Sequence, residues 1–215
     1  MYVVDSQKSW SELASSSLLL KAVSSWRKDP ESWLEGSFER LPETVRVNPL
    51  RTDSKWVEEW ISEQGGKPVP WFMGPGTAWE MPFSRGLAEG KTREMLIALH
   101  ETGRITRQEI VSMIPVLALQ VSAGDYVLDM CASPGSKTTQ ISECLGEDGV
   151  VFANEISNSR ANTLVSNVHR HGSKSAVVIN HDGRHLPNMP NHGFDKVLVD
   201  APCTGSATTR KNPEV

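Results

Sequence analysis

The second half of the chain alternates short apolar runs with longer stretches of helical spacing. The apolar runs lie at residues 126–128, 149–155, 176–182 and 194–200, and each ends in a carboxylate or is followed at once by one. Helical stretches separate them, notably residues 159–171. Strands that alternate with helices are typical of a parallel sheet. We therefore predict an α/β fold with a Rossmann-like sheet, of which about four strands are present.

The first run leads into a tight turn at Pro134-Gly135, and a helix is predicted to begin at Ser136. A strand, a small-residue turn and a helix N-terminus let backbone N–H groups approach a nucleotide-like ligand. Glycine leaves room for that approach. The stretch has neither Gly-x-Gly-x-x-Gly nor Gly-x-x-x-x-Gly-Lys-Ser/Thr, so it does not favour a dinucleotide or a nucleoside triphosphate. The alternative is an ordinary strand–turn–helix that binds nothing.

Four carboxylates follow the four predicted strands: Asp129, Glu155, Asp182 and Asp200. Ligands of open α/β sheets bind at the carboxyl ends of the strands. Four carboxylates there suit a ligand with hydroxyls, amines and a positive centre, as in S-adenosylmethionine. Glu155 is placed for ribose hydroxyls and Asp182 for the base, while Asp129 and Asp200 would lie near the amino group and the sulfonium. Each carboxylate alone could equally be a helix cap or part of a solvated turn.

The first half of the chain predicts a mainly helical α+β region. Residues 11–27 have helical spacing, 41–48 resemble a strand, and Asp53 could cap a helix through Ile61 with Trp56, Val57 and Trp60 on its inner side. Residues 68–86, rich in Pro and Gly, predict a connector or irregular loop. Residues 106–121 predict an amphipathic helix with a kink at Pro115. We expect an N-terminal accessory region at 1–105 and the α/β domain at 106–215.

Aromatic residues interleave with arginine in the predicted loop at 68–86. Trp71, Phe72 and Trp79 lie in the same stretch as Arg85. Exposed aromatics beside arginine can stack on RNA bases. The alternative interpretation is a small satellite core under a long loop.

Composition is that of a water-soluble chain. It has 215 residues, a formal net charge of −4 and a mean hydropathy of −0.34, and no apolar run approaches membrane-spanning length. The three scattered cysteines do not form a disulfide framework, and no cysteine–histidine spacing suggests a metal site. We expect an intracellular monomer that binds no metal, in the cytoplasm or, in a eukaryote, in the nucleus.

Basic residues gather locally despite the net negative charge. Arg160, His169, Arg170, His171 and Lys174 cluster around one predicted helix, and Arg210-Lys211 follow the last strand. They could contact RNA phosphates, or they could form a solvated helix face. The histidines are irregularly spaced, and we interpret His169, His171, His181, His185 and His192 as surface or RNA-facing.

The motifs in combination resemble the NOL/NOP/Sun (Nsun) family of RNA cytosine-5 methyltransferases. The resemblance covers most of residues 40–215, and Trp71, Ala78-Trp79, Ser84-Arg85 and Asn180-His181-Asp182 are most similar to its tRNA-modifying branch. It implies a methyltransferase domain at 106–215 after an RNA-binding or accessory region at 1–105. The stretches that carry it are 41–49, 103–115, 128–140, 153–160, 180–183 and 200–213.

The resemblance implies an S-adenosylmethionine-dependent reaction through a covalent cysteine–cytosine adduct, which needs an activated thiolate. It makes Cys203 the cysteine that assists product release, and Lys137 a residue that lines the active site. With Asp200, these are the catalytic candidates. The cofactor-binding candidates are Cys131, Ala132, Pro134, Gly135, Lys137, Glu155, Arg160, Asp182, Gly183 and Asp200.

The chain departs from the family pattern in two places. The family usually reads Pro-Cys-Ser-Gly-Asp-Gly, whereas this chain has Cys203-Thr204-Gly205 followed by Ser206-Ala207-Thr208. The attacking cysteine of the family lies in a Thr-Cys motif after the next strand, and none follows here. We therefore expect an N-terminal fragment, inactive alone, of a tRNA-acting enzyme. The alternatives are a ribosomal-RNA methyltransferase of the same family and a non-catalytic RNA-binding relative.

Overall fold

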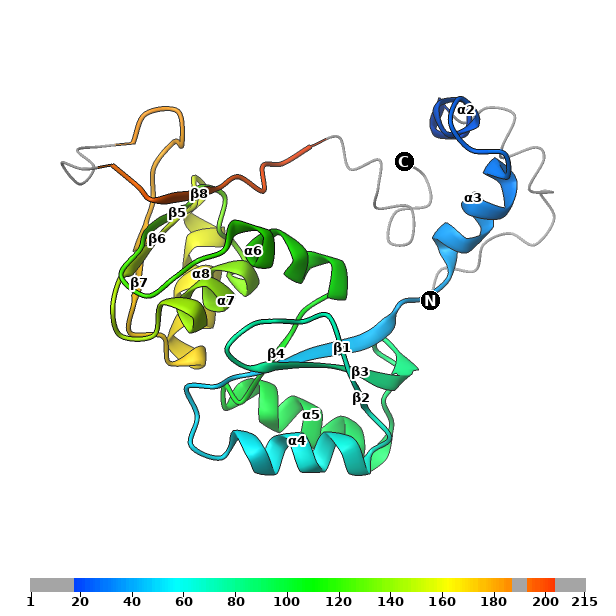
Figure 1. Ribbon diagram of the computed structural model, residues 1–215, viewed down its shortest axis with the longest axis horizontal. Coiled ribbons are helices and arrows are strands. Elements are labelled where there is room, and N and C mark those ends of the chain that lie inside the picture. The colour runs from blue at the N-terminus through cyan, green and yellow to red at the C-terminus, as the bar shows by residue number, and fades with distance from the viewer. Residues whose placement is uncertain (1–17, 187–192, 204–215) are drawn as a thin grey trace. The chain divides into compact units, whose positions relative to one another are not determined.

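The computed structural model describes residues 18–186 and 193–203 (Figure 1). Residues 42–201 form one compact unit that contains both sheets of the described chain. None of the helices in these described ranges combines the length and the apolar character needed to cross a bilayer.

Two helices precede the compact unit. Helix α2 spans Leu18–Ser24 and helix α3 spans Pro30–Phe38. Proline suits the first turn of α3, where an N–H would have no helical partner. The predicted helix at 11–27 is wrong at its C-terminal end, which lies at Ser24, and its residues 11–17 lie outside the described ranges.

The N-terminal sheet is antiparallel and has four strands. The predicted strand at 41–48 is confirmed as the central strand β1, and its Val47 lies opposite both Thr77 and Ile105. In spatial order the strands are β2 (Lys67–Pro68), β3 (Thr77–Ser84), β1 (Pro42–Val47) and β4 (Ile105–Arg107).

Strand β3 corrects the prediction of an irregular loop at 68–86. Eight of these residues form a strand, although Pro82 lies within it. Strand β2 pairs β3 only at Trp79 and Glu80, so Pro82 lies where one side of β3 has no partner strand. Proline lacks the N–H of a sheet ladder but is tolerated at such positions.

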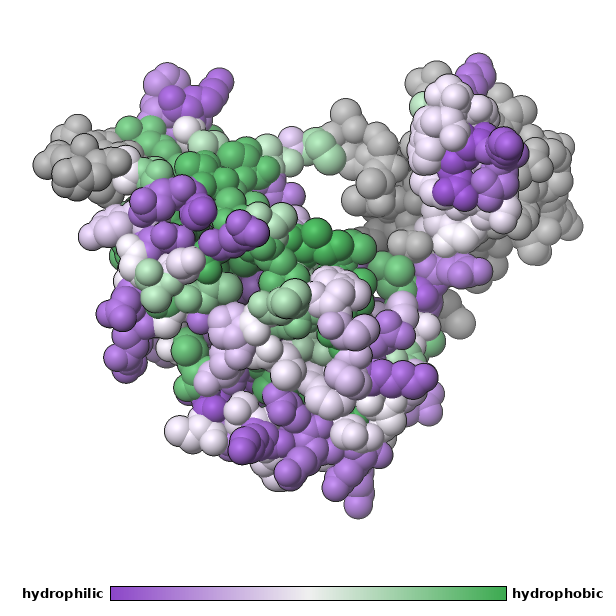
Figure 2. Space-filling model, in the orientation of Figure 1, coloured by the Kyte–Doolittle hydropathy of each residue, from purple (hydrophilic) through white to green (hydrophobic). Residues whose placement is uncertain are grey.

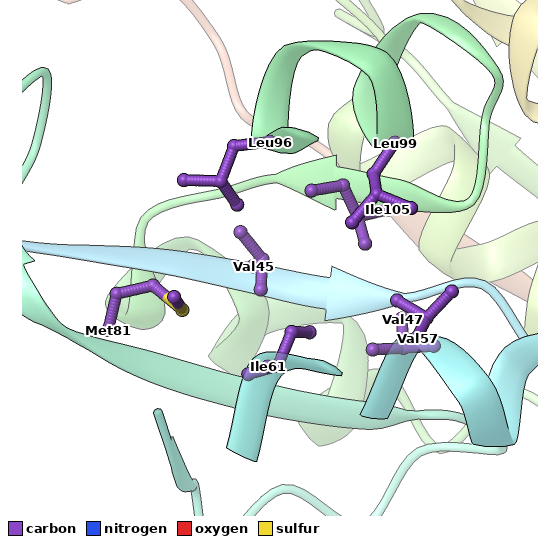
Figure 3. Close-up of a cluster of buried hydrophobic side chains, with 8 residues drawn as sticks. All are labelled: Val45, Val47, Val57, Ile61, Met81, Leu96, Leu99 and Ile105. Atoms are coloured by element: carbon purple, nitrogen blue, oxygen red, sulfur yellow. The ribbon is translucent and has the colours of Figure 1, made fainter. Parts of the chain in front are cut away.

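Helices α4 (Ser54–Glu63) and α5 (Gly90–Glu101) cover one face of this sheet (Figure 1). The helix predicted from Asp53 is thus confirmed as α4, but its Trp56 faces outward with 47% of its surface exposed. Figure 3 shows the side chains of both helices converging on those of the strands. The fully buried cluster contains Val45, Val47, Val57, Ile61, Met81, Leu96, Leu99 and Ile105.

The aromatic residues of the 68–86 segment serve mainly as packing. Phe72 packs against the buried Val69, Ala78 and Met113, and Trp79 packs against the core between the sheet and α4 and α5. Trp71 is 42% exposed. The satellite-core interpretation therefore holds for Phe72 and Trp79.

The helix predicted at 106–121 is wrong in extent. Thr106 and Arg107 belong to β4, a short 3-10 helix covers Ile110–Met113, and helix α6 covers only Ile114–Leu119. Pro115 lies in the first turn of α6 and begins the helix rather than kinking it.

The second sheet is parallel and confirms the four predicted strands. Helices α7 (Ser136–Leu145) and α8 (Asn158–His171) connect its first three strands. Every strand pair is parallel, so all carboxyl ends meet at one edge of the sheet. In spatial order the strands are β7 (Ala176–Ile179), β6 (Val150–Asn154), β5 (Tyr126–Asp129) and β8 (Lys196–Leu198).

Apolar residues also gather on the surface around α6 and β8 (Figure 2). Val111 lies in the 3-10 helix before α6 and Ile114 begins α6, whereas Val197 lies on β8 and Val199 follows it. Each of these four side chains is between 45% and 57% exposed. Strand β8 is an edge strand of the described sheet.

A buried arginine joins the two sheets. Arg46 on β1 has no exposed surface, and its side chain leaves the face opposite the apolar core. Its Nε donates to Glu143 Oε2 at 2.7 Å and its Nη2 donates to Thr139 Oγ1 at 3.0 Å, both on α7. Its Nη1 donates to Gln108 Oε1. The other carboxylate oxygen of Glu143 lies 2.9 Å from His171 Nε2 on α8. The charge is therefore paired and bonded, as a buried charge must be.

Backbone contacts next to β1 continue the same junction. Asn48 Nδ2 donates to the carbonyl oxygens of Gly103 (2.8 Å) and His171 (2.9 Å). Gly103 adopts a φ of +69°, and a Cβ there would lie 1.9 Å from the carbonyl oxygen of Arg170. Only glycine fits this approach, so the turn after α5 packs directly on the end of α8.

We predict that Arg46→Ala lowers the free energy of unfolding by about 3–5 kcal/mol. The substitution leaves Glu143 buried without its charged partner, which is the costly way to break a buried pair. Chemical denaturation followed by circular dichroism measures the change. Lys174→Ala, which breaks an ion pair with both side chains more than three-quarters exposed, is the control and should change stability little. Equal losses in the two variants would contradict the inferred role of Arg46.

Candidate functional site

The turn after β5 brings backbone to the carboxyl edge of the sheet. The strand ends at Asp129, and α7 begins at Ser136 after Gly135, whose φ is +107°. A Cβ on Gly135 would lie 2.9 Å from a methyl carbon of Leu164 on α8. Conformation and space therefore both require glycine here, and the turn is held close to α8.

Asp129 is the most buried of the four predicted carboxylates, with 1% of its surface exposed. Its Oδ2 accepts a 2.7 Å hydrogen bond from Thr138 Oγ1 in the first turn of α7. Burial raises the pKa of the Asp129 carboxyl to about 6, and nearby Asp200 adds to the rise, whereas the Thr138 bond and Lys137 oppose it. The site therefore holds a carboxyl group that titrates near neutral pH.

Lys137 and Asp200 form an ion pair across the ends of β5 and β8. Lys137 Nζ donates to Asp200 Oδ2 at 2.7 Å, and the lysine side chain is 16% exposed against 59% for the aspartate. Lys137 lies in the first turn of α7, where a cation is unfavourable for the helix dipole. Asp200 supplies the compensating charge. The structure thus brings together Asp129, Lys137 and Asp200, as the sequence predicted.

Glu155 is nearly buried at the end of β6. Its side chain is 6% exposed and lies 3.2 Å from Arg160 Nε. Its Oε1 accepts from the Ser157 N–H at 3.0 Å. Arg160 also donates from Nη2 to the carbonyl oxygen of Ser133 at 2.8 Å. Arg160 therefore links Glu155 to the Pro134-Gly135 turn.

Asn154 is a site residue that the sequence reasoning missed. This buried amide donates to the carbonyl oxygens of Met130 and His181, each at 3.0 Å, and its Oδ1 accepts from the His181 N–H at 3.1 Å. The backbone of Asn154 also accepts from the N–H of Ala132 at 2.8 Å. The loops after β5 and β7 are thus tied to the end of β6. An amide at the end of an otherwise apolar strand was the available signal.

Asp182 and Gly183 lie in the loop after β7. Asp182 accepts from the Arg184 side chain at 2.6 Å, and this contact holds the pKa of the Asp182 carboxyl far below its ordinary value. A Cβ on Gly183 would lie 2.9 Å from Met130 Cγ. The loop therefore approaches the turn after β5 closely, at the point where the sequence placed the base of the ligand.

The three cysteines lie in different environments. Burial raises the pKa of the Cys131 thiol in the β5 turn, with nearby carboxylates adding to the rise, and burial raises that of Cys144 on α7 to about 11. Neither is primed as a thiolate. Cys203 is exposed. Along the chain it follows the compact unit of residues 42–201.

The histidine interpretation needs one correction. His169, His181 and His185 are exposed, but His171 is 3% exposed and belongs to the Arg46–Glu143 network. It lies on the inner face of α8 against the N-terminal sheet. His192 lies outside the described residues.

Comparisons with known proteins identify the family of this chain. Residues 116–215 match the family model described as 16S rRNA methyltransferase RsmB/F. The multisite-specific tRNA:(cytosine-C(5))-methyltransferase of Saccharomyces cerevisiae is 33% identical over 97% of this chain and 36% of its own length. The 28S rRNA (cytosine-C(5))-methyltransferase of Mus musculus is 32% identical over 85% of this chain and 22% of its own. This chain belongs to the RsmB/F and NOL1/NOP2/Sun family of RNA cytosine-5 methyltransferases.

The fold of the family is confirmed by a solved structure. The crystal structure of a methyltransferase homolog from Pyrococcus horikoshii superimposes with a TM-score of 0.65 and 29% identity, over 84% of this chain and 57% of that one. The chain spans about a third or less of the length of the two curated relatives named above.

The carboxyl edge of this family member fits S-adenosylmethionine. The turn at Gly135 has no room for a side chain, and carboxylates follow all four strands. Buried acceptors at a parallel sheet edge suit a ligand that carries hydroxyls, an amino group and a positive centre.

We predict that Asp129 makes stability depend on pH between about 4 and 6. The folded pKa of about 6 lies above the ordinary value of 3.8. The stability contributed by this group is therefore full below about pH 4 and is lost as the pH rises to about 6. At about 1.4 kcal/mol per pKa unit, the loss is roughly 3 kcal/mol. Urea titrations at constant ionic strength measure it.

In Asp129→Asn this loss should disappear, because the amide keeps an acceptor for Thr138 and does not ionise. Asp148→Asn, at an exposed carboxylate, is the control and should follow the wild-type curve. A wild-type slope that persists in Asp129→Asn would assign the titration to another group.

Proposed function

We propose that this protein methylates carbon 5 of cytosine in tRNA, with S-adenosylmethionine as the methyl donor. The observation that carries the proposal is the group formed by Asp129, Lys137 and Asp200, at the edge where a backbone turn and the carboxylate of Glu155 also meet. Membership in a family of RNA cytosine-5 methyltransferases supports the reaction class.

Each residue has a role in this proposal. Glu155 accepts hydrogen bonds from the ribose hydroxyls, and Asp182 with Gly183 borders the base. Asp129 and Asp200 offset the positive charge of the donor, and the backbone from Cys131 to Gly135 packs against it. Arg160 holds Glu155 and the turn in register through its 2.8 Å bond to Ser133. The bound donor supplies an electrophilic methyl group.

The chemistry at cytosine requires a thiolate and a nearby acid. Carbon 5 becomes nucleophilic when a thiolate adds to carbon 6, and a base must later remove the carbon-5 proton so that the thiol leaves. Lys137, held at 2.7 Å from Asp200, is placed to face the cytosine ring. Cys203, which follows Asp200 by three residues, assists product release.

The tRNA assignment depends on motifs in the chain. Ala78-Trp79, Ser84-Arg85 and Asn180-His181-Asp182 are most similar to the tRNA-modifying branch. Curated relatives of similar identity carry both tRNA and ribosomal-RNA names, so the second candidate is a ribosomal-RNA methyltransferase. We propose further that residues 1–105 form an accessory RNA-binding region and 106–215 the methyltransferase domain of an intracellular monomer.

Methylation of purified RNA tests the function. The full-length protein is incubated with S-adenosylmethionine and either total tRNA or ribosomal RNA, and 5-methylcytosine is mapped by bisulfite sequencing. We expect new 5-methylcytosine in tRNA alone. Modification confined to ribosomal RNA would replace the tRNA assignment. RNA binding without modification of either class would favour a non-catalytic relative.

Replacement of Glu155 tests the cofactor site. We predict that Glu155→Ala weakens S-adenosylmethionine binding by about 1–3 kcal/mol, because charge-assisted hydrogen bonds to the ribose are lost. Isothermal titration calorimetry measures the affinity. Glu155→Gln keeps acceptor oxygen and should lose less, and Glu147→Ala on the exposed surface should lose nothing. An unchanged affinity in Glu155→Ala would reject the ribose role.

A further inference from the structure

A cavity of about 200 Å³ lies at the junction of the two sheets, behind the Pro134-Gly135 turn. On one side it is bounded by the end of α5 and by β4, and on the other by the start of α7 and the last turns of α8. One water needs only about 10–15 Å³ measured this way, so the cavity can take a group much larger than a water molecule.

The lining of this cavity is basic. His100, Arg107, Arg170 and His171 all contribute to it, whereas no aspartate or glutamate does. Arg107 is held by a 2.9 Å bond from its Nε to Glu43 Oε1, and its side chain remains 32% exposed. The donor-binding edge, by contrast, is lined with carboxylates. The cavity on one side of the Pro134-Gly135 turn therefore favours an anion, whereas the carboxylate-lined edge on the other side favours a cation.

Of the two arginines that line the cavity, Arg107 is paired with Glu43 and Arg170, in the described part of the chain, is not. Among the described residues, no carboxylate forms an ion pair with its guanidinium. The pKa of the His100 imidazole is lowered, mainly by burial and next by the positive charge of Arg170. Arg170 therefore lies close enough to His100 for its charge to act on it. A second orphan group borders the cavity: His171 is 3% exposed, and its Nδ1 has no hydrogen-bond partner in the described structure.

The position of Arg170 is fixed by the junction itself. Its carbonyl oxygen accepts from Arg51 Nη2 at 2.9 Å, and Gly103 packs so closely that a Cβ there would lie 1.9 Å from the same oxygen. The cavity also includes Gly135 and Ser136 at the start of the ten-residue helix α7, where the helix dipole favours an anion. Arg107 from the N-terminal sheet, Arg170 from α8 and the N-terminal end of α7 therefore border the same cavity.

The lining also limits what the anion can be. It contains no Phe, Tyr or Trp, and Ile105 and Pro134 are its largest apolar residues. Of its two imidazoles, His171 is 3% exposed and engaged with Glu143, which leaves His100 as the aromatic ring open to stacking. A phosphate needs only cations and N–H donors, and these make up more of the lining. We propose that this cavity binds a backbone phosphate of the RNA substrate. The inference rests on the proposed function, and it adds a contact on the far side of the turn that holds the methyl donor.

The test compares two variants that each remove one positive charge, one on the last turn of α8 and one just after that helix. Arg170→Gln removes the cavity charge, and Lys174→Gln removes a charge at a residue that is 79% exposed and outside the cavity. Fluorescence anisotropy of labelled tRNA is measured at several salt concentrations. We expect Arg170→Gln to bind about tenfold more weakly and to lower the salt slope by about one. Arg170→Lys should recover the slope.

Controls separate this inference from the proposed function. Calorimetry should give an unchanged S-adenosylmethionine affinity and thermal unfolding an unchanged midpoint for Arg170→Gln, since no hydrogen bond or ion pair ties its guanidinium to the described part of the chain. If wild type methylates RNA while Arg170→Gln binds it as tightly as Lys174→Gln does, only the cavity proposal is overturned. If wild type binds no RNA, both fail. Inorganic phosphate could stabilise wild type but not Arg170→Gln, while the RNA affinity of the two proteins stays the same. That result would assign the cavity to a small anion and overturn the RNA proposal.

Discussion

The burial of one guanidinium is the constraint on which the arrangement of the compact unit depends. Arg46 comes from an inner strand of the antiparallel sheet, yet its partners Thr139 and Glu143 lie on α7, which packs on the parallel sheet. A charge without access to water needs these partners simultaneously. The two sheets consequently cannot separate or slide without stranding both Arg46 and Glu143, and this explains why residues 42–201 behave as one unit.

Helix α7 transmits this constraint to the proposed donor-binding edge. Its inner face is held by Arg46 through Thr139 and Glu143, and its first turn is held by Asp129 through Thr138. Lys137 directly precedes these anchors on the same helix, so its backbone has little freedom. The antiparallel sheet therefore contributes to the proposed active site without reaching it, because it fixes the helix from which the site's lysine extends.

The sequence predicted the elements whose signals are local and periodic. The four parallel strands were recognisable because each apolar run ends in a carboxylate, and the turn at Gly135 because strand, small residues and helix follow one another. Strand β3 was missed because its Pro82, and the Pro and Gly residues before it, mimic a loop, while its pairing with β1 joins residues far apart in sequence. The buried role of His171 was equally invisible, since it depends on Glu143 and Arg46 from two other elements. Among the candidate site residues, Asp129 and Asp200 were predictable from their positions at strand ends and Lys137 from its place in the first turn of a helix. Asn154 instead acts through three backbone contacts that no spacing reveals.

Asn154 has a thermodynamic consequence for ligand binding. One side-chain amide is shared by the loops after β5 and β7, so those loops are already ordered relative to each other before any ligand arrives. Ordering a flexible loop on binding carries an entropy cost, and a loop held in place beforehand avoids it. Affinity for a small, highly charged ligand can therefore come from relatively few direct contacts. The same rigidity sets a limit, because a ligand that needs these two loops farther apart would have to break the bonds of the amide to them.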